Sequence, residues 1–266
     1  MLKFTKLSKP YIEVDGSFGG NQGWFGDITR KWKGNAITGF GCGLIGAADV
    51  LYYITGGLFL YPPGTVSAKL QGSKQQGTAS PNFISKEDYM NYIQFIERRY
   101  FHILPKLGIS GVLLSLGFNL YFFLNRKKIK KQTGSRFKAR WAVPSGKLLD
   151  RIREMINQDM PVIISIGPGF FHKNKLKFYR LEERDGKMHF RHVTDTKDHY
   201  VTVTGIVESS KEDVASGDVK MDENGIVLLE ISSWGKKYYV NYSEYIDFVK
   251  KNDNFYFSNI LYIKKR

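Results

Sequence analysis

Cysteine is almost absent from this chain of 266 residues, in which Cys42 is the only one. A single cysteine excludes an internal disulfide, so nothing here requires an oxidising compartment. The first residues, MLKFTKLSKPYIEVDGS, also lack the apolar run and small-residue cleavage site of a secretory signal peptide. We therefore expect no signal peptide and a cytoplasmic location.

Long hydrophobic runs are scarce as well. The longest, ISGVLLSLGFNLYFFL at 109–124, is short of the roughly 20 residues that a membrane-spanning helix needs. The basic stretch NRKKIKK follows it and suits the C-terminal end of a helix dipole. We expect a buried helix of a folded domain here and no transmembrane helix.

Metal and phosphate motifs are missing too. One cysteine and scattered histidines do not provide the ligand spacing of a zinc site. The glycine-rich GSFGGNQG at 16–23 has neither the Lys-Ser/Thr nor the preceding strand of a phosphate-binding loop. We expect no metal and no cofactor.

Positive charge is in excess, with 40 Lys and Arg against 25 Asp and Glu, a net charge of +15. Such a charge allows an anionic partner: nucleic acid, a membrane surface or an acidic polymer. A lysine-rich solvated surface explains it equally simply, because the basic residues are spread along the chain with one cluster at 126–131. No nucleic-acid motif accompanies the charge, so the solvated surface is favoured and no specific nucleic acid is expected.

The chain, 42% hydrophobic and 24% charged, has the composition and length of a single folded domain at 1–266. Residues 1–38 are rich in glycine and aromatic residues and predict mainly loop. Residues 39–157 predict a mainly helical part with a flexible insertion at 61–82, and 158–266 a mainly antiparallel β part. Helices followed by strands predict an α+β fold.

The single cysteine stands at the predicted start of a helix, in GFGCGLIGAADVLYYI at 39–54. Apolar residues three and four apart indicate a helix after Cys42, and Gly41 and Gly43 flank the thiol. The helix dipole contributes about 0.3–1 kcal/mol, less than one pKa unit. A nucleophilic thiolate at neutral pH therefore needs a cationic partner, usually histidine.

His199 is the best candidate partner because it opens the alternating strand DHYVTVTGI, which holds it rigidly. The other histidines lie among aromatic residues, in loops or at hairpin edges. Further on, in LLEISSWGKKYYV, a predicted strand runs into Ser232-Ser233-Trp234-Gly235, and a second strand follows the glycine.

Together these motifs resemble the papain-like cysteine peptidases. In that family a cysteine opens a long helix, a histidine opens a strand, and Asn-Ser-Trp-Gly follows, where this chain has SSWG. The chain is also similar to the bacteriocin-leader-processing peptidases, in which CG opens the helix, and to clostridial members of the superfamily. The resemblance runs from about residue 20 to the C-terminus. It implies a papain-like fold and hydrolysis of peptide or isopeptide bonds by a thiolate–imidazolium pair.

Carried over residue by residue, the resemblance makes Cys42 the nucleophile and His199 the general base. Ser232 stands where the family has Asn or Asp, and Trp234 would shield its contact with the ring. Serine is shorter and adds no charge. This departure leaves open a catalytically weak or inactive relative that binds a peptide or protein partner, or a related amidase or acyltransferase.

At the oxyanion donor the chain departs from the family, because the family glutamine a few residues before the cysteine is missing from NAITGFG. Gln22 is the nearest one upstream, and glycines at 19, 20 and 23 would let its loop approach the site. Asn21 and Asn35 are alternatives.

Two further features are open. Asp49, on the same helix face as Cys42, is either catalytic or a structural hydrogen-bond partner. Gly167, with Pro168 and Gly169, either lines a substrate cleft or forms an ordinary turn.

Overall fold

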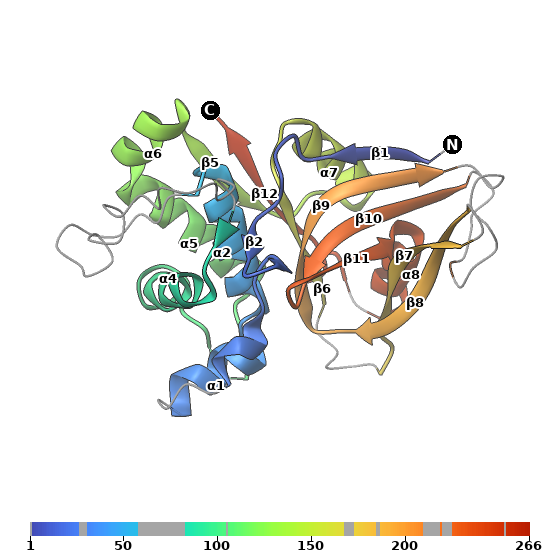
Figure 1. The fold of residues 1–266 in the computed structure, drawn as a ribbon, viewed down its shortest axis with the longest axis horizontal. Coiled ribbons are helices and arrows are strands. Elements are labelled where there is room, and N and C mark those ends of the chain that lie inside the picture. Colours follow the sequence, from blue (N-terminus) through green and yellow to red (C-terminus); the bar gives the residue numbers. More distant parts are fainter. Residues whose placement is uncertain are drawn as a thin grey trace.

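The computed structural model describes residues 2–26, 31–57, 83–104, 106–167, 173–184, 187–209, 219, 225–252 and 254–266. The predicted insertion at 61–82 lies outside these residues. The described chain is a mixed α+β fold built on a large antiparallel sheet, as expected (Figure 1).

The large sheet carries the second half of the chain. Its strands lie in the order β5 (Phe137–Trp141), β12 (Ile260–Lys265), β6 (Val162–Ile166), β9 (His199–Ser209), β10 (Ile226–Ser233), β11 (Lys236–Asn241), β7 (Leu176–Arg184) and β8 (Lys187–Thr196). β6 pairs with the first half of β9, and β1 (Lys3–Lys6) pairs with the second half on the same side. β9 is therefore the central strand, and it is buried along most of its length.

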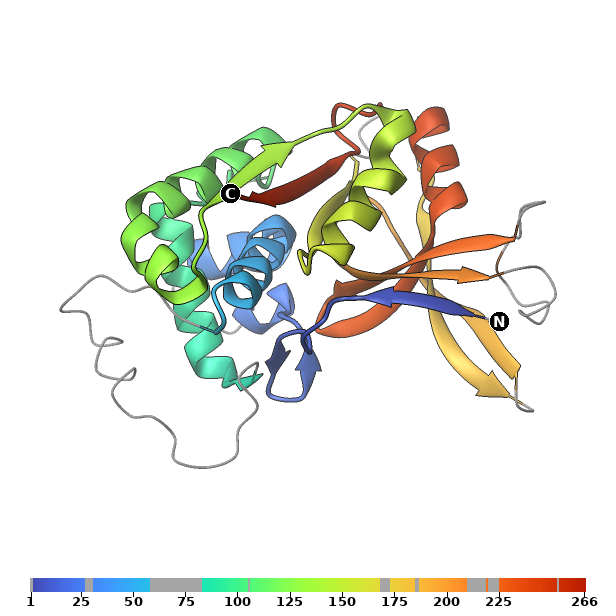
Figure 2. The ribbon, with the colours of Figure 1, turned by 90° about the horizontal axis from the view of Figure 1, so that it is seen from above.

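The helices gather mainly at one end of the molecule (Figure 2). They are α1 (Lys31–Phe40), α2 (Cys42–Ile54), α4 (Lys86–Arg99), α5 (Gly111–Leu124), α6 (Arg126–Thr133), α7 (Leu148–Asn157) and α8 (Tyr242–Asn252), with the short 3-10 helices η1 (Gln22–Phe25) and η2 (Ser145–Lys147). A small sheet of β2 (Glu13–Val14), β3 (Ser17–Phe18) and β4 (Phe83–Ile84) lies beside them. α2 packs on β9 and β6 and also on α4 and α5, so it joins the two halves.

Several local features position the elements. Ser85 caps α4 by accepting a hydrogen bond from the Asp88 backbone N–H at 3.1 Å. β7 and β8 form a hairpin, in which Arg184 pairs with Lys187. β6 is buried along its whole length.

The division of the chain is less clean than the sequence suggested. The N-terminal region, predicted as mainly loop, contributes β1 to the large sheet and also contains β2, β3, η1 and most of α1. From the mainly helical part, β5 pairs with β12. Both strands depend on partners far along the chain, which local sequence patterns do not reveal.

The prediction that 109–124 is a buried helix is only half right. One face of α5 packs on β5 and β12, but the other exposes Val112, Leu113, Leu116, Leu120, Phe123 and Leu124. An all-apolar helix has no polar stripe to mark its outer face, so the sequence did not reveal this exposure. Within the described residues, no helix is long and apolar enough to cross a membrane.

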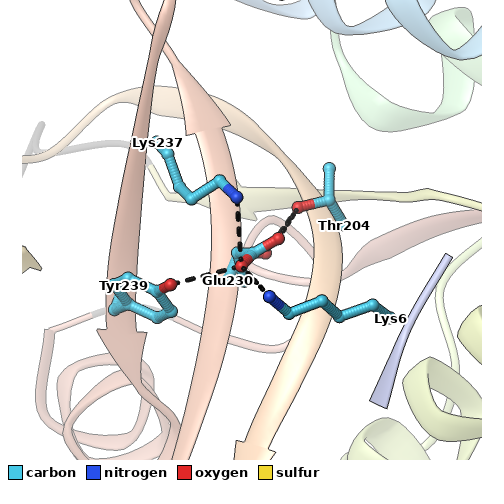
Figure 3. A network of polar contacts seen from close by, with 5 residues as sticks. All are labelled: Lys6, Thr204, Glu230, Lys237 and Tyr239. Atoms are coloured by element: carbon cyan, nitrogen blue, oxygen red, sulfur yellow. Dashed lines mark hydrogen bonds and ion pairs between the residues drawn. The ribbon is translucent and has the colours of Figure 1, made fainter. Parts of the chain in front are cut away.

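A buried carboxylate links four strands of the sheet (Figure 3). Glu230 on β10 accepts hydrogen bonds from Thr204 on β9 at 3.1 Å and from Tyr239 on β11 at 3.2 Å. Lys6 on β1 and Lys237 on β11 lie 3.6 and 3.4 Å from its carboxylate. These partners satisfy a charge that would be costly to bury alone.

Candidate active site

Cys42 is the first residue of α2, as predicted, and is half-buried. Gly41 separates it from α1 and donates its backbone N–H to the Ile37 carbonyl at 2.8 Å. A Cβ at Gly41 would lie 2.4 Å from that same oxygen. Glycine at this position therefore lets α2 follow α1 with a single residue between the two helices.

Small residues also let the start of α2 approach β9 closely. A Cβ on Gly43 would lie 3.2 Å from the Tyr200 ring, and one on Gly46 would lie 3.2 Å from Thr202 Oγ1. Tyr200 follows His199 directly, and its backbone hydrogen-bonds the Cys42 thiol. The end of α2 that carries the cysteine thus lies beside the end of β9 that carries the histidine.

His199 is buried and held on two sides. Its Nε2 is 2.8 Å from Ser233 Oγ, and its ring stacks on Trp234 with centroids 4.5 Å apart and planes 20° apart. With the Nε2–H tautomer, the ring donates to Ser233 and leaves Nδ1 with a lone pair.

The tight turn between β10 and β11 places Trp234 over this ring. Ser233 pairs with Lys236, so Trp234 and Gly235 form a two-residue hairpin loop. Their φ values of 50° and 71° are those of a type I′ turn. A positive φ is costly for tryptophan, and Phe178 and Tyr238, whose ring centroids lie 5.8 and 6.2 Å from that of Trp234, support its side chain.

The residue that contacts the histidine is Ser233, whereas the resemblance pointed to Ser232. Ser232 Oγ donates to the Phe18 carbonyl at 2.8 Å instead. Neighbouring residues of a strand point to opposite faces, so a shift of one position exchanges these roles.

Gln22 lies in η1 and lines the same cavities as Cys42 and His199. Its Nε2 donates one hydrogen to the Thr38 carbonyl at 2.9 Å, which leaves the second amide hydrogen for another acceptor. Asn21 instead caps η1 by accepting from the Gly23 backbone N–H at 2.8 Å. The side chain of the other alternative, Asn35, lies outside the described residues.

Asp49 has the structural role that the sequence left open. Its buried carboxylate accepts hydrogen bonds from the Gly20 backbone N–H at 3.1 Å, from Tyr11 at 3.2 Å and from Tyr89 at 2.5 Å. Burial raises its pKa to about 6, although these hydrogen bonds act to lower it. Asp49 therefore ties the loop before Gln22 to α2 and α4, and Tyr11 and Tyr89 are partners that the sequence analysis missed.

Cys42, His199 and Gln22 line two connected hollows. The inner one has a volume of about 20 Å³, room for about one water, and is closed by Asp49, Ser232, Ser233 and Trp234 among others. The outer one is a cleft of about 970 Å³. Gly167 lines this cleft and donates its backbone N–H to Ser258 Oγ at 2.8 Å. Pro168 and Gly169 lie outside the described residues.

The walls of the outer cleft are mainly apolar. They include Phe40, Leu104, Leu107, Ile109, Val112, Leu113, Trp141, Tyr256 and Phe257. Local sequence patterns do not reveal this wall, which is assembled from four separate parts of the chain. Leu107 and Tyr256 are 69% and 62% exposed, which suits a surface that receives an apolar ligand.

Burial favours the neutral forms of both reactive groups. It raises the pKa of the Cys42 thiol, and Asp198 adds to this, while backbone hydrogen bonds from Tyr200, Gly43 and Cys42 itself lower it. Burial lowers the pKa of His199 to about 3. The thiolate–imidazolium pair expected from the resemblance is therefore not the form that burial favours in the free protein. The cleft is therefore lined by a neutral thiol and a neutral imidazole.

Comparisons with protein-family models, with curated proteins and with solved structures find no match. The described residues also contain no cluster of three or more His, Cys, Asp and Glu that could hold a metal ion. The interpretation of the site therefore depends on its own residues and geometry.

Proposed function

We propose that the protein is a cysteine peptidase with a papain-like arrangement, in which Cys42 is the nucleophile and His199 the general base. The observation that carries this proposal is that both residues line one cleft while Ser233 occupies Nε2 of the ring. Nδ1 is then the nitrogen left to take the proton of the thiol.

The burial of both groups shapes the proposed mechanism. The thiol gives its proton to His199 as its sulfur attacks the carbonyl carbon of the scissile bond, so the charges form during the reaction. The free hydrogen of the Gln22 amide stabilises the oxyanion. When the intermediate collapses, the C–N bond breaks, the imidazolium protonates the leaving amine, and a thioester on Cys42 remains. Water, deprotonated by His199, hydrolyses the thioester and releases the free thiol.

The test is acylation of Cys42 by peptidyl 4-nitrophenyl esters with apolar side chains, which fit the apolar cleft. We expect a burst of nitrophenolate and an acyl group on Cys42 by mass spectrometry. Cys42→Ala should show neither, and His199→Ala should acylate at least about a hundredfold more slowly, because a general base contributes that much or more. His192→Ala is the matched control, since His192 pairs with Asp195 and lines neither hollow. Equal acylation of the wild type and His199→Ala would contradict the proposal.

A second candidate is a peptide-binding protein without catalysis. The lowered pKa of His199 and the raised pKa of Cys42 favour it, because neither group is pre-activated. Its signature would be binding of an apolar peptide in the cleft, measured by calorimetry with the wild type, without any acylation of Cys42.

A further inference from the structure

The exposed face of α5 is a continuous apolar surface. Its six members are Val112 (40% exposed), Leu113 (43%), Leu116 (58%), Leu120 (45%), Phe123 (62%) and Leu124 (53%). At 3.6 residues per turn they fall within an arc of about 120°. Surfaces of this kind, when bordered by polar residues, mark sites of interaction with proteins or membranes.

The orientation of this face is fixed by the protein. The Asn119 amide donates to the Ala139 carbonyl and accepts from the Ala139 N–H, both at 3.0 Å, and so clamps α5 to β5. On the opposite side of α5, Leu114, Phe118 and Tyr121 are fully buried. The apolar face is therefore held outward.

Basic residues surround the far end of this face. Residues 101–149 contain no Asp or Glu but ten Lys and Arg: Lys106, Arg126, Lys127, Lys128, Lys130, Lys131, Arg136, Lys138, Arg140 and Lys147. This segment alone carries ten of the fifteen net positive charges. All five basic residues of α6 are exposed, and the Arg126 guanidinium lies 5.3 Å from the centre of the exposed Phe123 ring.

Three of the charges on α6 are available to a partner. In the part of the chain that the structure describes, Lys127, Lys130 and Lys131 form no ion pair. The concentration of charge beside α5 also argues against the evenly solvated basic surface favoured from composition.

The combination selects one partner. We propose that the face formed by α5 and α6 docks on the surface of an anionic lipid bilayer. The leucines and Phe123 enter the boundary between headgroups and acyl chains, and the lysines of α6 bind the lipid phosphates. A nucleic acid would satisfy the lysines but leave the apolar side chains exposed, and a two-fold dimer through this face would bring two acid-free basic segments together.

The geometry favours contact along the membrane surface. α5 has 14 residues and is about 21 Å long, against a hydrocarbon core of about 30 Å. Val112 and Leu113 belong both to this face and to the wall of the catalytic cleft. The cleft therefore opens beside the docked surface. This step rests on the proposed function, by which the cleft would receive a membrane-bound peptide.

The test is co-sedimentation of the protein with vesicles. We expect binding to vesicles of equimolar phosphatidylcholine and phosphatidylglycerol, weakening with salt, and none to phosphatidylcholine alone. A basic residue near an anionic surface contributes about fivefold to binding, so Lys127→Glu/Lys130→Glu/Lys131→Glu should weaken it by a hundredfold or more. The control Lys173→Glu/Lys175→Glu/Lys177→Glu changes the net charge equally at exposed positions around the start of β7 and should bind nearly as well as wild type.

The apolar side chains of α5 are tested separately. Leu116→Gln/Leu120→Gln should also weaken binding to the anionic vesicles, and circular dichroism checks that this variant folds. Failure to bind the anionic vesicles, or equal loss in the two lysine variants, would overturn the proposal. So would a solution dimer that the leucine variant dissociates, or RNA binding that anionic vesicles do not displace. The assay is also run with Cys42→Ala, which should bind like the wild type, so its outcome does not depend on catalysis.

Discussion

At the scale of single residues, the setting of His199 decides how the site can work. The ring is buried, stacked on Trp234 and bonded through Nε2 to Ser233. A buried imidazole with one nitrogen hydrogen-bonded is held in orientation, and burial favours its neutral form. On the proposed function, Ser233 would act on the reaction through the histidine, as a positioning residue.

We predict different effects for the two adjacent serines. Ser233→Ala should slow acylation of Cys42 about fivefold, because one hydrogen bond of about 1 kcal/mol no longer orients the ring. Ser232→Ala should leave the acylation rate nearly unchanged and lower the free energy of unfolding by about 1 kcal/mol, because it loses the bond to Phe18 and none to the ring.

The readouts are the nitrophenolate burst and urea unfolding of each variant. Ser233→Asn, which restores a side-chain oxygen next to the ring, should recover part of the rate. If Ser232→Ala is the slower variant, the positioning role belongs to Ser232, as the family resemblance suggested.

At the scale of elements, the sequence predicted α2 and β9 well because their signals are local. The spacing of apolar residues after Cys42 lies within one helix. The alternation of residues after His199 lies within one strand. The partner of His199 was missed by one position, because the SSWG motif alone does not tell which serine faces the ring. β1, β5 and the outward face of α5 were missed because each depends on contacts with distant residues.

The junction of α1 and α2 provides a prediction at this scale. Gly41→Ala would place a Cβ 2.4 Å from a backbone oxygen, so the two helices must shift, and we expect a loss of about 1–3 kcal/mol. Gly39→Ala, two residues earlier in α1, has no atom within 4 Å of the new Cβ and should be neutral or slightly stabilising. The measurement is the urea midpoint of both variants. Equal destabilisation would show that the close contact at Gly41 does not constrain the start of α2.

At the scale of the whole molecule, the site is assembled from the N-terminal region, the helical end and the sheet. Asp49 is where the first two meet, since Tyr11, Gly20 and Tyr89 all donate to its carboxylate. A Cβ on Gly19 would lie 2.5 Å from Asp49 and 2.4 Å from Ser232, so this loop also touches the sheet. The sequence showed Asp49 on the helix face of Cys42, but these donors lie 29–40 residues away and were not predictable.

This buried carboxylate should leave a signature in the pH dependence of stability. The pKa of Asp49 is raised from 3.8 to about 6 in the folded protein, so folding favours its protonated form. The stabilisation that comes from this group is fully present below about pH 4 and is lost as the pH rises through about 6. Its loss lowers the free energy of unfolding by about 3 kcal/mol. The pKa of His199 is lowered to about 3, so folding favours its neutral form. Its contribution to the free energy of unfolding therefore decreases as the pH falls below the ordinary pKa of histidine, the opposite trend to that of Asp49.

Comparing the wild type with Asp49→Asn isolates the first effect, because other groups contribute equally to both proteins. The asparagine variant is destabilised by those donors to Asp49 that the amide does not satisfy, and this destabilisation does not change with pH. We therefore expect the free energy of unfolding of the wild type, relative to the variant, to fall by about 3 kcal/mol between about pH 4 and pH 7 and then level off. Urea unfolding across this range measures it. Asp150→Asn, at an exposed carboxylate with 76% of its side chain accessible, is the control for removing one carboxylate. A difference that is flat with pH, or that rises, would mean that Asp49 is ionised in the folded protein as readily as in water, with its three donors outweighing its burial.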